Sequence, residues 1–286
     1  FLRSDIFDTL KFHDIDKTPG QEERLSWDAS DIKRLLSRRV SASVSENSVQ
    51  ELMLESSLLD DIFCEQVDIE HPIDYILSRT LMRPREAIQF CNLALNVAQD
   101  NSRKFISAND IRTAESRYSE WKLRDLISEF QIQYPYLDIL LPMFNGFKVI
   151  FNRDEFSQRY LSSKARLKSV YPGLKSYRES TIIKELYDIG FLGISVGRDV
   201  SDSVLYSYSK KNNESPEFSS LDNFFVIHPA YRSALEMKYE GRMRRESGQY
   251  NVNQVLIGDR NIAGEVYRNS ITINTSGGSI SMSGSV

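Results

Sequence analysis

The sequence lacks the features on which several common protein classes depend. No apolar run approaches the ~18 residues of a membrane-spanning helix and no signal peptide is visible, so no membrane partner is expected. Only two cysteines occur, Cys64 and Cys91, and both lie among apolar residues in helical-looking sequence. They are predicted to be buried thiols in a reducing cytoplasm, which excludes a disulfide-stabilised secreted domain.

Catalytic and metal-binding patterns are also missing. The three histidines, His13, His71 and His228, are scattered and have no ligand spacing with cysteines or carboxylates, so no metal site is expected. No Ser/His/Asp or Cys/His set stands out either. None of the 13 glycines is followed by lysine, so the phosphate loop G-x-x-x-x-G-K-[ST] does not occur. A chain without that loop is not expected to hydrolyse ATP on its own.

The composition is that of an ordinary folded protein. The chain has 286 residues and a mass of 33.0 kDa, with 41% hydrophobic and 27% charged residues. This size allows two or three small domains. The formal net charge of -4 argues against a surface devoted to nucleic acid, although it leaves room for one local basic patch.

Apolar spacing predicts helices over much of the first half of the chain. A first helix follows a Ser26 or Asp28 cap, and the serine-rich stretch 41–50 is predicted to be a loop. Residues 51–130 show almost continuous helical spacing, interrupted by a cap at Ser107 to Asp110. One of these helices is predicted to carry its apolar side chains on a single face, formed by Ile88, Cys91, Leu95 and Ala98. The pattern is typical of a small helical bundle.

From Asn152 the pattern changes to that of a winged-helix domain. Asn152 with Glu155 predicts a capped helix through Leu161, and Ser176 with Glu179 predicts a second helix that ends at Gly190. The strands expected after it are 191–196, 204–209 and 224–227, followed by a helix that begins at Pro229. The fold class predicted from the whole sequence is therefore mainly α, with an α+β part.

The last segment is predicted to be β-rich. Apolar and polar residues alternate on both sides of Gly277-Gly278, which is a strong two-residue hairpin signal. An isolated hairpin is marginally stable in water, so it is expected to dock on the preceding domain or to join strands from another copy, giving a homo-oligomer.

Arginines next to helix or strand ends are the candidate anion-binding residues. Arg83-Pro84-Arg85 precedes an apolar helix whose first amides and partial positive charge can face a phosphate. Arg3 follows an apolar start and offers a planar fork of donors to phosphate oxygens. The alternatives are a surface arginine for Arg3, and for the other residues an ordinary helix start in which Pro84 is the first residue and Glu86 complements the dipole.

Four segments carry a family resemblance. They are Phe-Leu-Arg-Ser-Asp-Ile-Phe at the start, Asp14-Ile-Asp16-Lys17, Leu25-Ser-Trp27-Asp28, and the run from Asp74 through Arg83-Pro84-Arg85 to Asn92. Together they resemble a bacterial family of P-loop ATPases related to STAND and AAA+ proteins, over roughly residues 1–130. The resemblance implies that Arg3 is the sensor-1 arginine and that Arg83, Pro84 and Arg85 belong to the sensor-2 or lid contact with nucleotide. Because the chain opens on Phe1, without Walker A or Walker B, ATP and Mg are expected only if an N-terminal segment supplies them.

The resemblance implies four regions. They are a remnant of the ATPase core at 1–45, a helical lid at 46–150, a winged-helix domain at 151–246 and a β-hairpin tail at 247–286. The function expected is that of a regulatory lid and winged helix in an ATPase switch, with antiviral defence as the setting that the resemblance implies. Its partners would be the ATPase core segment or an effector protein.

Two other functions compete with this one. The winged helix and the cluster Arg242, Arg244 and Arg245 could form a DNA-binding adaptor, but basic and acidic residues balance on the helix after Ser176, so DNA is the less favoured partner. The second alternative is a structural assembly module that uses the tail hairpin.

Overall fold

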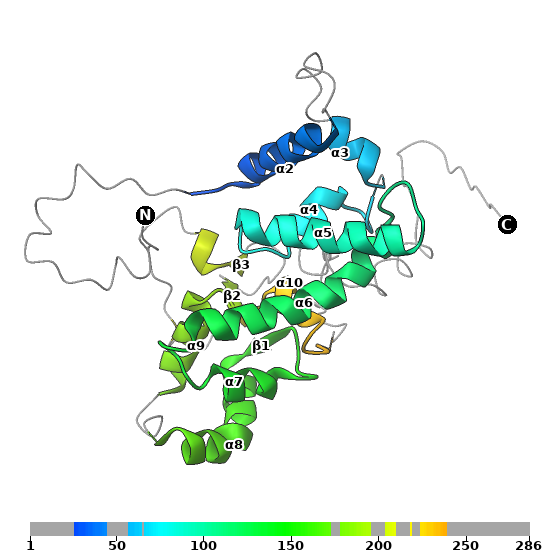
Figure 1. The fold of residues 1–286 in the computed structure, drawn as a ribbon. Coiled ribbons are helices and arrows are strands. Elements are labelled where there is room, and N and C mark those ends of the chain that lie inside the picture. Colours follow the sequence, from blue (N-terminus) through cyan, green and yellow to red (C-terminus); the bar gives the residue numbers. More distant parts are fainter. Residues whose placement is uncertain are drawn as a thin grey trace, which may run out of the picture.

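A computed structural model of the chain describes residues 26–44, 57–64, 66–172, 178–195, 204–209, 218 and 224–238. Helices predominate, and they are joined by one small antiparallel sheet. Figure 1 shows α2 to α5 in the upper part and α7 and α8 in the lower part, with the long helix α6 running between them and strands of the sheet drawn both above and below α6. The fold is thus mainly α with an α+β part, as the sequence predicts.

Five helices form the upper part. They are α2 (Ala29–Val44), α3 (Ser57–Ile62), α4 (Pro72–Leu77), α5 (Pro84–Asp100) and α6 (Ala108–Phe130). Two of the predicted caps are present. The Asp28 carboxylate accepts a hydrogen bond from the Asp31 amide at 2.8 Å, and Ser107 and Asp110 form a reciprocal capping box at the start of α6. Helices α5 and α6 pack along each other, and stacked rings of Phe90 and Tyr118, with centroids 4.5 Å apart, lie in their contact.

Two predictions about these helices are wrong. Residues 41–44 belong to α2 rather than to a loop, because no Gly or Pro interrupts the serine-rich turn and Val40 still packs on the core. The buried face of α5 is also rotated from the one expected. Cys91 is only half-buried and Leu95 is 41% exposed, because small residues and Phe90 make the contact with α6. The buried apolar side chains of α5 are Ala87, Phe90, Ala94, Val97 and Ala98.

The lower part contains short helices and the sheet. Its helices are α7 (Leu137–Leu140), the 3-10 turn η2 (Leu141–Phe144), α8 (Arg153–Val170), α9 (Glu179–Asp188), the 3-10 turn η4 (Ser207–Ser209) and α10 (Pro229–Arg232). Its strands are β1 (Ile150–Asn152), β2 (Leu192–Ser195), β3 (Val204–Leu205) and β4 (Phe224–Ile227), in the order β1-β4-β2-β3. All neighbouring strands are antiparallel. Two helices, antiparallel strands and a closing helix follow the order expected of a winged helix, and β1 adds a strand that the sequence analysis missed.

Three boundaries in this part differ from the prediction. The capping box of Asn152 and Glu155 is present, but α8 continues to Val170 instead of ending at Leu161. Helix α9 begins at Glu179, and its cap residue Arg178 makes no side-chain cap hydrogen bond. Ser176, the cap residue that the sequence predicts, lies outside the described residues. Strand β3 ends at Leu205. The chain leaves the sheet there because the ring of Tyr206 packs against His228, with centroids 4.7 Å apart.

Aromatic rings fill the core of the lower part. The Phe144 ring lies 5.1 Å from Phe191, 6.0 Å from Phe151 and 6.3 Å from Phe156, measured between centroids. This cluster joins η2 to β1, α8 and the start of β2. It fixes the sheet against the helices that precede and follow it.

The two parts meet along α6 and the loop before α5. Helix α10 packs on α6, and the Ala234 amide donates a 2.9 Å hydrogen bond to Ser119 Oγ. Gly190, which ends α9 as predicted, has a φ of 76° and sits so close to Leu81 that an added Cβ would lie 3.1 Å from Leu81 Cδ1. Both contacts hold the lower part against the upper part.

Several predicted features fall outside the described residues. They are Arg3 with the rest of residues 1–25, the basic cluster Arg242 to Arg245, and the tail hairpin around Gly277-Gly278. Among the described helices, none combines the length and the low polarity needed to cross a bilayer.

Candidate functional site

The candidate site is the N-terminal end of α5, where the sequence places Arg83, Pro84 and Arg85. Met82 adopts a left-handed φ of 53°, which turns the chain sharply into the helix. Arg83 then occupies the cap position in an extended conformation and makes no side-chain cap hydrogen bond. Pro84 is the first helical residue, as predicted, because its missing N–H costs nothing at that position.

Both arginines bind carboxylates of α6. Arg83 Nη1 lies 2.8 Å and 3.1 Å from the two oxygens of Glu129, and Arg85 Nη2 lies 2.9 Å and 3.0 Å from those of Asp125. The side chains of Arg83 and Arg85 remain 40% and 65% exposed. The structure therefore brings together two of the three predicted anion-binding arginines. Each is bound to an acid of α6, and each arginine remains accessible to solvent.

A fully buried ion pair lies beneath these surface pairs. One oxygen of Glu86 accepts a 2.6 Å hydrogen bond from the Leu81 amide, and the other accepts one at 2.7 Å from Lys122 Nζ. Neither Glu86 nor Lys122 is exposed, and Lys122 also lies 3.4 Å from Asp125. Glu86 thus does more than complement the helix dipole. It connects the turn before α5 to α6. The sequence analysis did not identify Lys122 as its partner.

A second buried cluster joins α4 to α6. Arg79 is fully buried and donates through Nε to Glu115 at 2.9 Å, while the Tyr75 hydroxyl donates to the other Glu115 oxygen at 2.6 Å. The guanidinium also lies 3.3 Å from the centroid of the Tyr75 ring. Burial raises the pKa of Tyr75 far above its ordinary value, so its hydroxyl stays protonated and acts as a donor.

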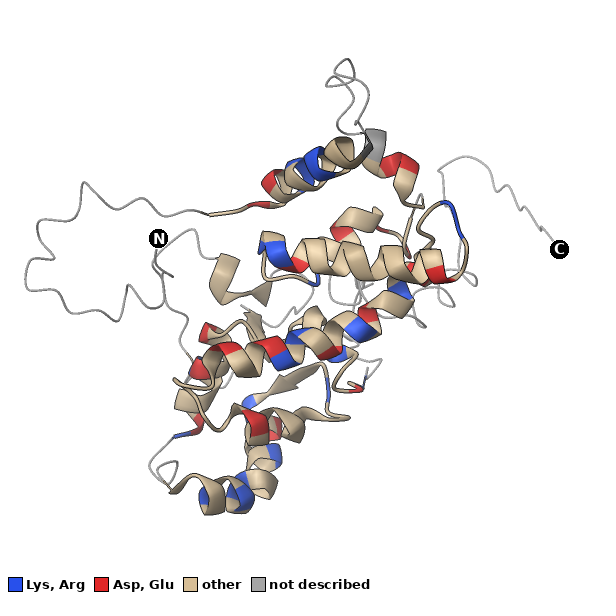
Figure 2. Cartoon of the chain, in the orientation of Figure 1, with Lys and Arg blue, Asp and Glu red and all other residues tan. Residues whose placement is uncertain are grey.

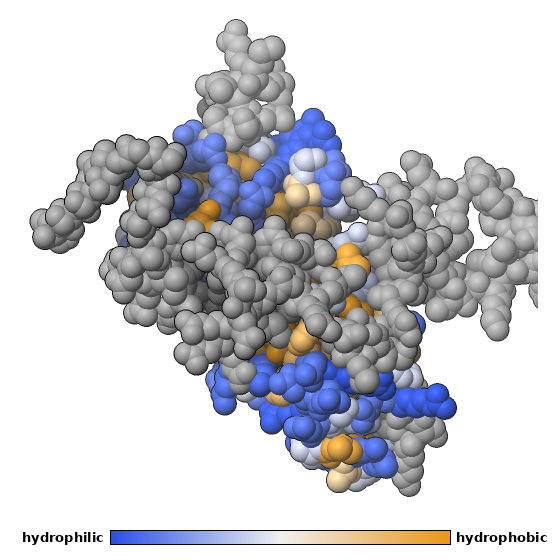
Figure 3. All heavy atoms as spheres, turned by 180° about the vertical axis from the view of Figure 1, so that it is seen from behind, coloured by the Kyte–Doolittle hydropathy of each residue, from blue (hydrophilic) through white to orange (hydrophobic). Residues whose placement is uncertain are grey.

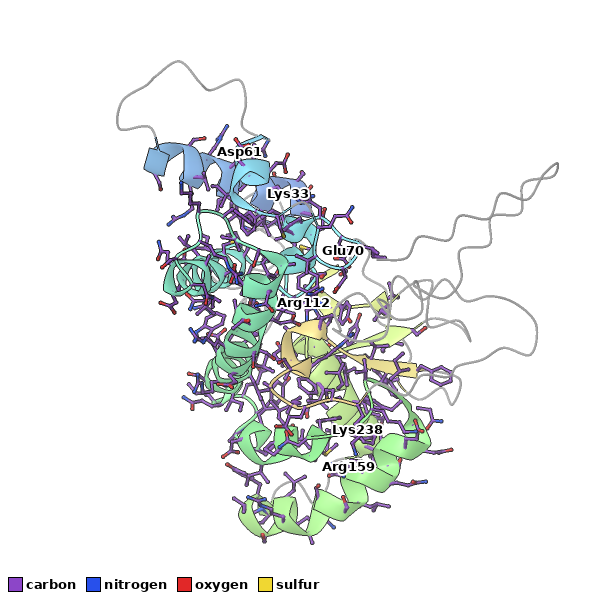
Figure 4. All side chains as sticks on the ribbon, turned by 90° about the vertical axis from the view of Figure 1, so that its right-hand side faces the viewer. Lys33, Asp61, Glu70, Arg112, Arg159 and Lys238 are labelled. Atoms are coloured by element: carbon purple, nitrogen blue, oxygen red, sulfur yellow. The ribbon has the colours of Figure 1, made fainter. Side chains whose placement is uncertain are left out.

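A carboxylate on the loop before α4 lies near this cluster. Figure 4 shows Glu70 on that loop close to Arg112 of α6, and Arg112 forms an ion pair with the neighbouring Asp68. Burial raises the pKa of Glu70 to about 7, against the opposing attraction of Arg79. Since this pKa is raised on folding, the loop is stabilised by the protonated acid, and that contribution is lost as the pH rises from about 4.5 through 7.

His228 lies in the lower part of the molecule, at the start of α10. Its Nδ1 accepts a 3.1 Å hydrogen bond from the Ala230 amide and so caps α10, much as His71 caps α4. The other ring nitrogen, Nε2, therefore carries the proton of the neutral ring and donates to the Tyr208 hydroxyl at 2.8 Å. Burial, together with the nearby cations Arg232, Lys122 and Arg79, holds the pKa of His228 well below its ordinary value.

The groups from the two parts share one electrostatic environment. The pKa values of Tyr118, Tyr208 and Tyr231 all lie well above the ordinary value, first because of burial and also because of the Glu86 charge. The hydroxyls of Tyr118 and Tyr231 are buried without a hydrogen-bond partner. The charge of Glu86 on α5 thus acts on tyrosines of both parts, namely Tyr118 of α6, Tyr208, and Tyr231 of α10.

Arg83 and Arg85 are the solvent-exposed cations of the candidate site. Within the described ranges, no group of three or more His, Cys, Asp and Glu side chains is arranged to hold a metal ion. An incoming phosphate can compete with Asp125 and Glu129 for the two arginines, because guanidinium binds both kinds of oxyanion through the same planar fork. Arg3 lies outside the described residues, so its predicted place beside a nucleotide stays a prediction.

Helix α9 has little net charge on its exposed side. Its exposed residues are Thr181, Lys184 and Asp188, and the last two form an ion pair. A DNA-reading helix normally shows a basic excess toward the phosphates. The described face of α9 lacks that basic excess, and the choice between packing and DNA reading stays a prediction.

Comparisons with known proteins give a family match for the upper part. The family described as "FunZ-associated C-terminal helical domain" matches residues 30–127, which run from α2 into α6. That description names a helical domain and no activity. No solved structure matches the chain.

Two curated proteins are similar over longer stretches. The chain is 24% identical over 260 residues, or 88% of its length, to a "Putative transposon gamma-delta 80.3 kDa protein" of Escherichia coli K12. It is also 24% identical over 149 residues, or 51% of its length, to "Allergen Alt a 2" of Alternaria alternata. The alignments span 36% of the Escherichia coli protein and 76% of the Alternaria protein. The chain thus spans about a third of the length of the Escherichia coli protein, which is named for a transposon.

Proposed function

We propose that this chain is the lid and winged-helix regulatory part of a STAND-like or AAA+-like P-loop ATPase switch. A segment with a phosphate loop, on the same polypeptide or another, would supply the bound ATP and Mg. Arg3, Arg83 and Arg85 would contact the nucleotide, and Pro84 would fix the start of the helix that carries the last two. The proposed setting is the cytoplasm.

One observation carries the proposal. The arginines at the start of α5 are held by carboxylates of α6, the same helix on which the winged-helix part packs through α10. A ligand that changes the partners of these arginines would therefore act directly on the helix shared by both parts. This is the geometry that a nucleotide switch requires.

The switching step follows from competition between oxyanions. If a γ-phosphate took Arg83, the Glu129 carboxylate, which is only 12% exposed, would no longer be bound by that guanidinium. The nearby Glu86 carboxylate would then repel it, with Lys122 as the remaining buried cation. Rotation or sliding of α6 would relieve that repulsion, and α10 would move with α6.

The comparisons agree with a part that works beside other segments. The matched description calls the helical domain C-terminal and associated, and the Escherichia coli protein extends far beyond the aligned region. The name of that relative suggests a setting among mobile genetic elements. Antiviral defence is the setting implied by the ATPase resemblance.

The test uses a protein in which the P-loop segment and this chain are present together. With Mg and a slowly hydrolysed ATP analogue, hydrogen exchange in α6 and α10 should change in the wild type and should not change in Arg83→Ala or Arg85→Ala. Arg103→Ala is the matched control, because Arg103 binds Asp110 at the other end of the same helix pair and is 36% exposed. Loss of the response in all three variants, or no response in the wild type, contradicts the proposal.

The isolated chain offers a second test. It should hydrolyse no ATP above background, because it contains no phosphate loop. Steady hydrolysis that Arg3→Ala abolishes would refute the assignment of the chemistry to another segment.

A further inference from the structure

A basic surface on α8 stands out from the rest of this acidic protein. From Phe156 to Arg178 the sequence contains Arg159, Lys164, Arg166, Lys168, Lys175 and Arg178 but no Asp or Glu. The whole chain, by contrast, has 40 acidic and 36 basic residues. Figure 2 shows basic residues gathered at the lower end of the molecule, on α8.

Several cations of the helical part are bound to acids, whereas three cations of α8 form no such pair within the described ranges. Arg79, Arg83, Arg85, Arg103, Arg112 and Lys122 all form ion pairs with carboxylates. Among the described residues, no ion pair joins Lys164, Arg166 or Lys168 to an acid. The nearest acids along the chain, Asp154 and Glu155, lie in the first turn of α8, and Glu155 is bound to Lys148.

The arrangement of side chains around α8 follows from its buried face. Phe156, Tyr160 and Leu167 face the core, so the opposite side presents the small residues Ser162, Ala165 and Ser169, which are all exposed. Lys164 and Lys168 lie along one flank of this small-residue strip, and Arg159 and Arg166 along the other. Arg159 is itself bound to the carbonyl oxygens of Met143 and Asn145, so Arg166 is the free guanidinium of its flank.

We infer that the strip 162–169 of α8, with its flanking cations, binds the phosphodiester backbone of duplex nucleic acid without reading its sequence. Small side chains let a backbone approach the helix, and cations on both flanks can reach its phosphates. Lys164 and Lys168 are one turn apart, about 6 Å along the axis, which suits neighbouring phosphates of one strand. The surface lies on α8 rather than on α9 or the Arg242 cluster, where the sequence placed DNA contacts.

Other polyanionic partners fit this surface less well. A membrane-binding helix needs a continuous apolar face, and here the only exposed apolar side chains of α8 are Leu161 and Val170 near the two ends of the strip. Figure 3 shows the lower part of the molecule covered mainly by hydrophilic residues, with one small apolar patch. A single-stranded nucleic acid would need exposed aromatic rings for stacking, and the strip of α8 carries none.

Binding of a fluorescent 30-base-pair duplex to the full chain tests this inference, by anisotropy at low and moderate salt and without nucleotide. The triple variant Lys164→Gln, Arg166→Gln, Lys168→Gln should bind at least about tenfold more weakly and with a shallower salt dependence, because each lost phosphate contact removes counterion release. Ala165→Glu should weaken binding too, since it puts a negative charge in the strip. The matched control is Lys33→Gln, Arg34→Gln, Arg39→Gln on α2, which removes the same net charge and should leave binding nearly unchanged.

Several outcomes would overturn the inference. They are the absence of duplex binding by the wild type, equal weakening in the two triple variants, and equally tight binding of poly-glutamate or of vesicles containing phosphatidylserine. Arg166 is exposed and Lys164 and Lys168 are partly exposed, so unchanged melting temperatures are expected and exclude unfolding as the cause of any loss. Exchange of each lysine for arginine, and of Arg166 for lysine, should restore binding.

Discussion

Lys122 lies fully buried between Glu86 and Asp125, and its ammonium is 2.7 Å from the nearer Glu86 oxygen. A buried ion pair of this kind adds little compared with apolar side chains of the same size, because both charges lose their hydration. Removing one partner has a much larger effect, since the other charge then remains buried without compensation. The pair therefore acts as a specific joint between α5 and α6.

We expect Lys122→Met to lower the free energy of unfolding by about 3–5 kcal/mol, because Glu86 is left ionised and buried. Adding Glu86→Gln should recover much of that loss, since the amide keeps an acceptor for the Leu81 N–H. Urea denaturation measures both effects. Lys184→Met, which breaks an exposed ion pair on α9, is the control and should change little. An equal effect at both lysines would show that the buried joint is unimportant.

His228 gives the interface a dependence on acidity. The pKa of His228 in the folded protein is well below the ordinary value of 6.5. Below pH 6.5 the histidine is therefore protonated in the unfolded chain while it is still neutral in the folded chain. The contribution of His228 is present above pH 6.5 and is lost as the pH falls, by up to about 1.4 kcal/mol per pH unit. Glu70 changes stability in the opposite direction over part of this range.

The variant His228→Asn isolates this effect, because asparagine can still cap α10 without titrating. Between pH 8 and pH 5, the wild type should lose more unfolding free energy than the variant in urea titrations. Parallel curves for the two proteins would mean that His228 becomes charged in the folded state.

At the scale of elements, capping patterns were the best guide to structure. Asp28, Ser107 and Asn152 each begin a helix where the sequence predicted one, because the cap and its partner are only three residues apart. The end of α8 was missed, since only Phe156, Tyr160 and Leu167 mark its buried face and the helical period is faint. A capping pattern lies within one helical turn and can be recognised from a few residues. The end of a helix that has few buried apolar residues cannot be recognised in this way.

The candidate site was only half predictable for the same reason. Arg83, Pro84 and Arg85 are adjacent and precede an apolar helix, so their position at its start could be expected. Their partners Asp125 and Glu129 look like ordinary surface acids of a different helix. No local pattern connects Glu86 with Lys122, or Lys122 with His228, because only the path of the chain brings them together.

Gly190 is the element boundary that can be tested most directly. Its φ of 76° favours glycine, and an added Cβ would also press on Leu81, so Gly190→Ala should cost about 1–3 kcal/mol of unfolding free energy. Gly146 also has a positive φ, of 62°, but its added Cβ would meet only the flexible end of Lys238 at 3.8 Å. Gly146→Ala is therefore the control, and thermal unfolding should show the smaller loss there. Equal losses would mean that contact with Leu81 adds nothing to the backbone strain.

At the scale of the whole molecule, the described elements form two parts around one helix. The sequence predicts mainly helices followed by an α+β part, and the described elements follow that order; the division into a lid and a winged helix stays a prediction. What it did not indicate is that α6 contacts both α5 and α10.

Because both parts of the molecule pack on α6, the helical domain is not easily separated from the part that follows it, either as a protein fragment or by recombination of genes. The family match ends at residue 127, inside the helix, yet Ser119 and Lys122 on that helix are fully buried, and Ser119 accepts a hydrogen bond from the Ala234 amide of the second part. A fragment cut at the family boundary would leave those polar groups and the apolar side of α6 facing water. Recombination that joined this helical domain to an unrelated successor would meet the same difficulty, so the two parts are expected to travel through genomes as a pair.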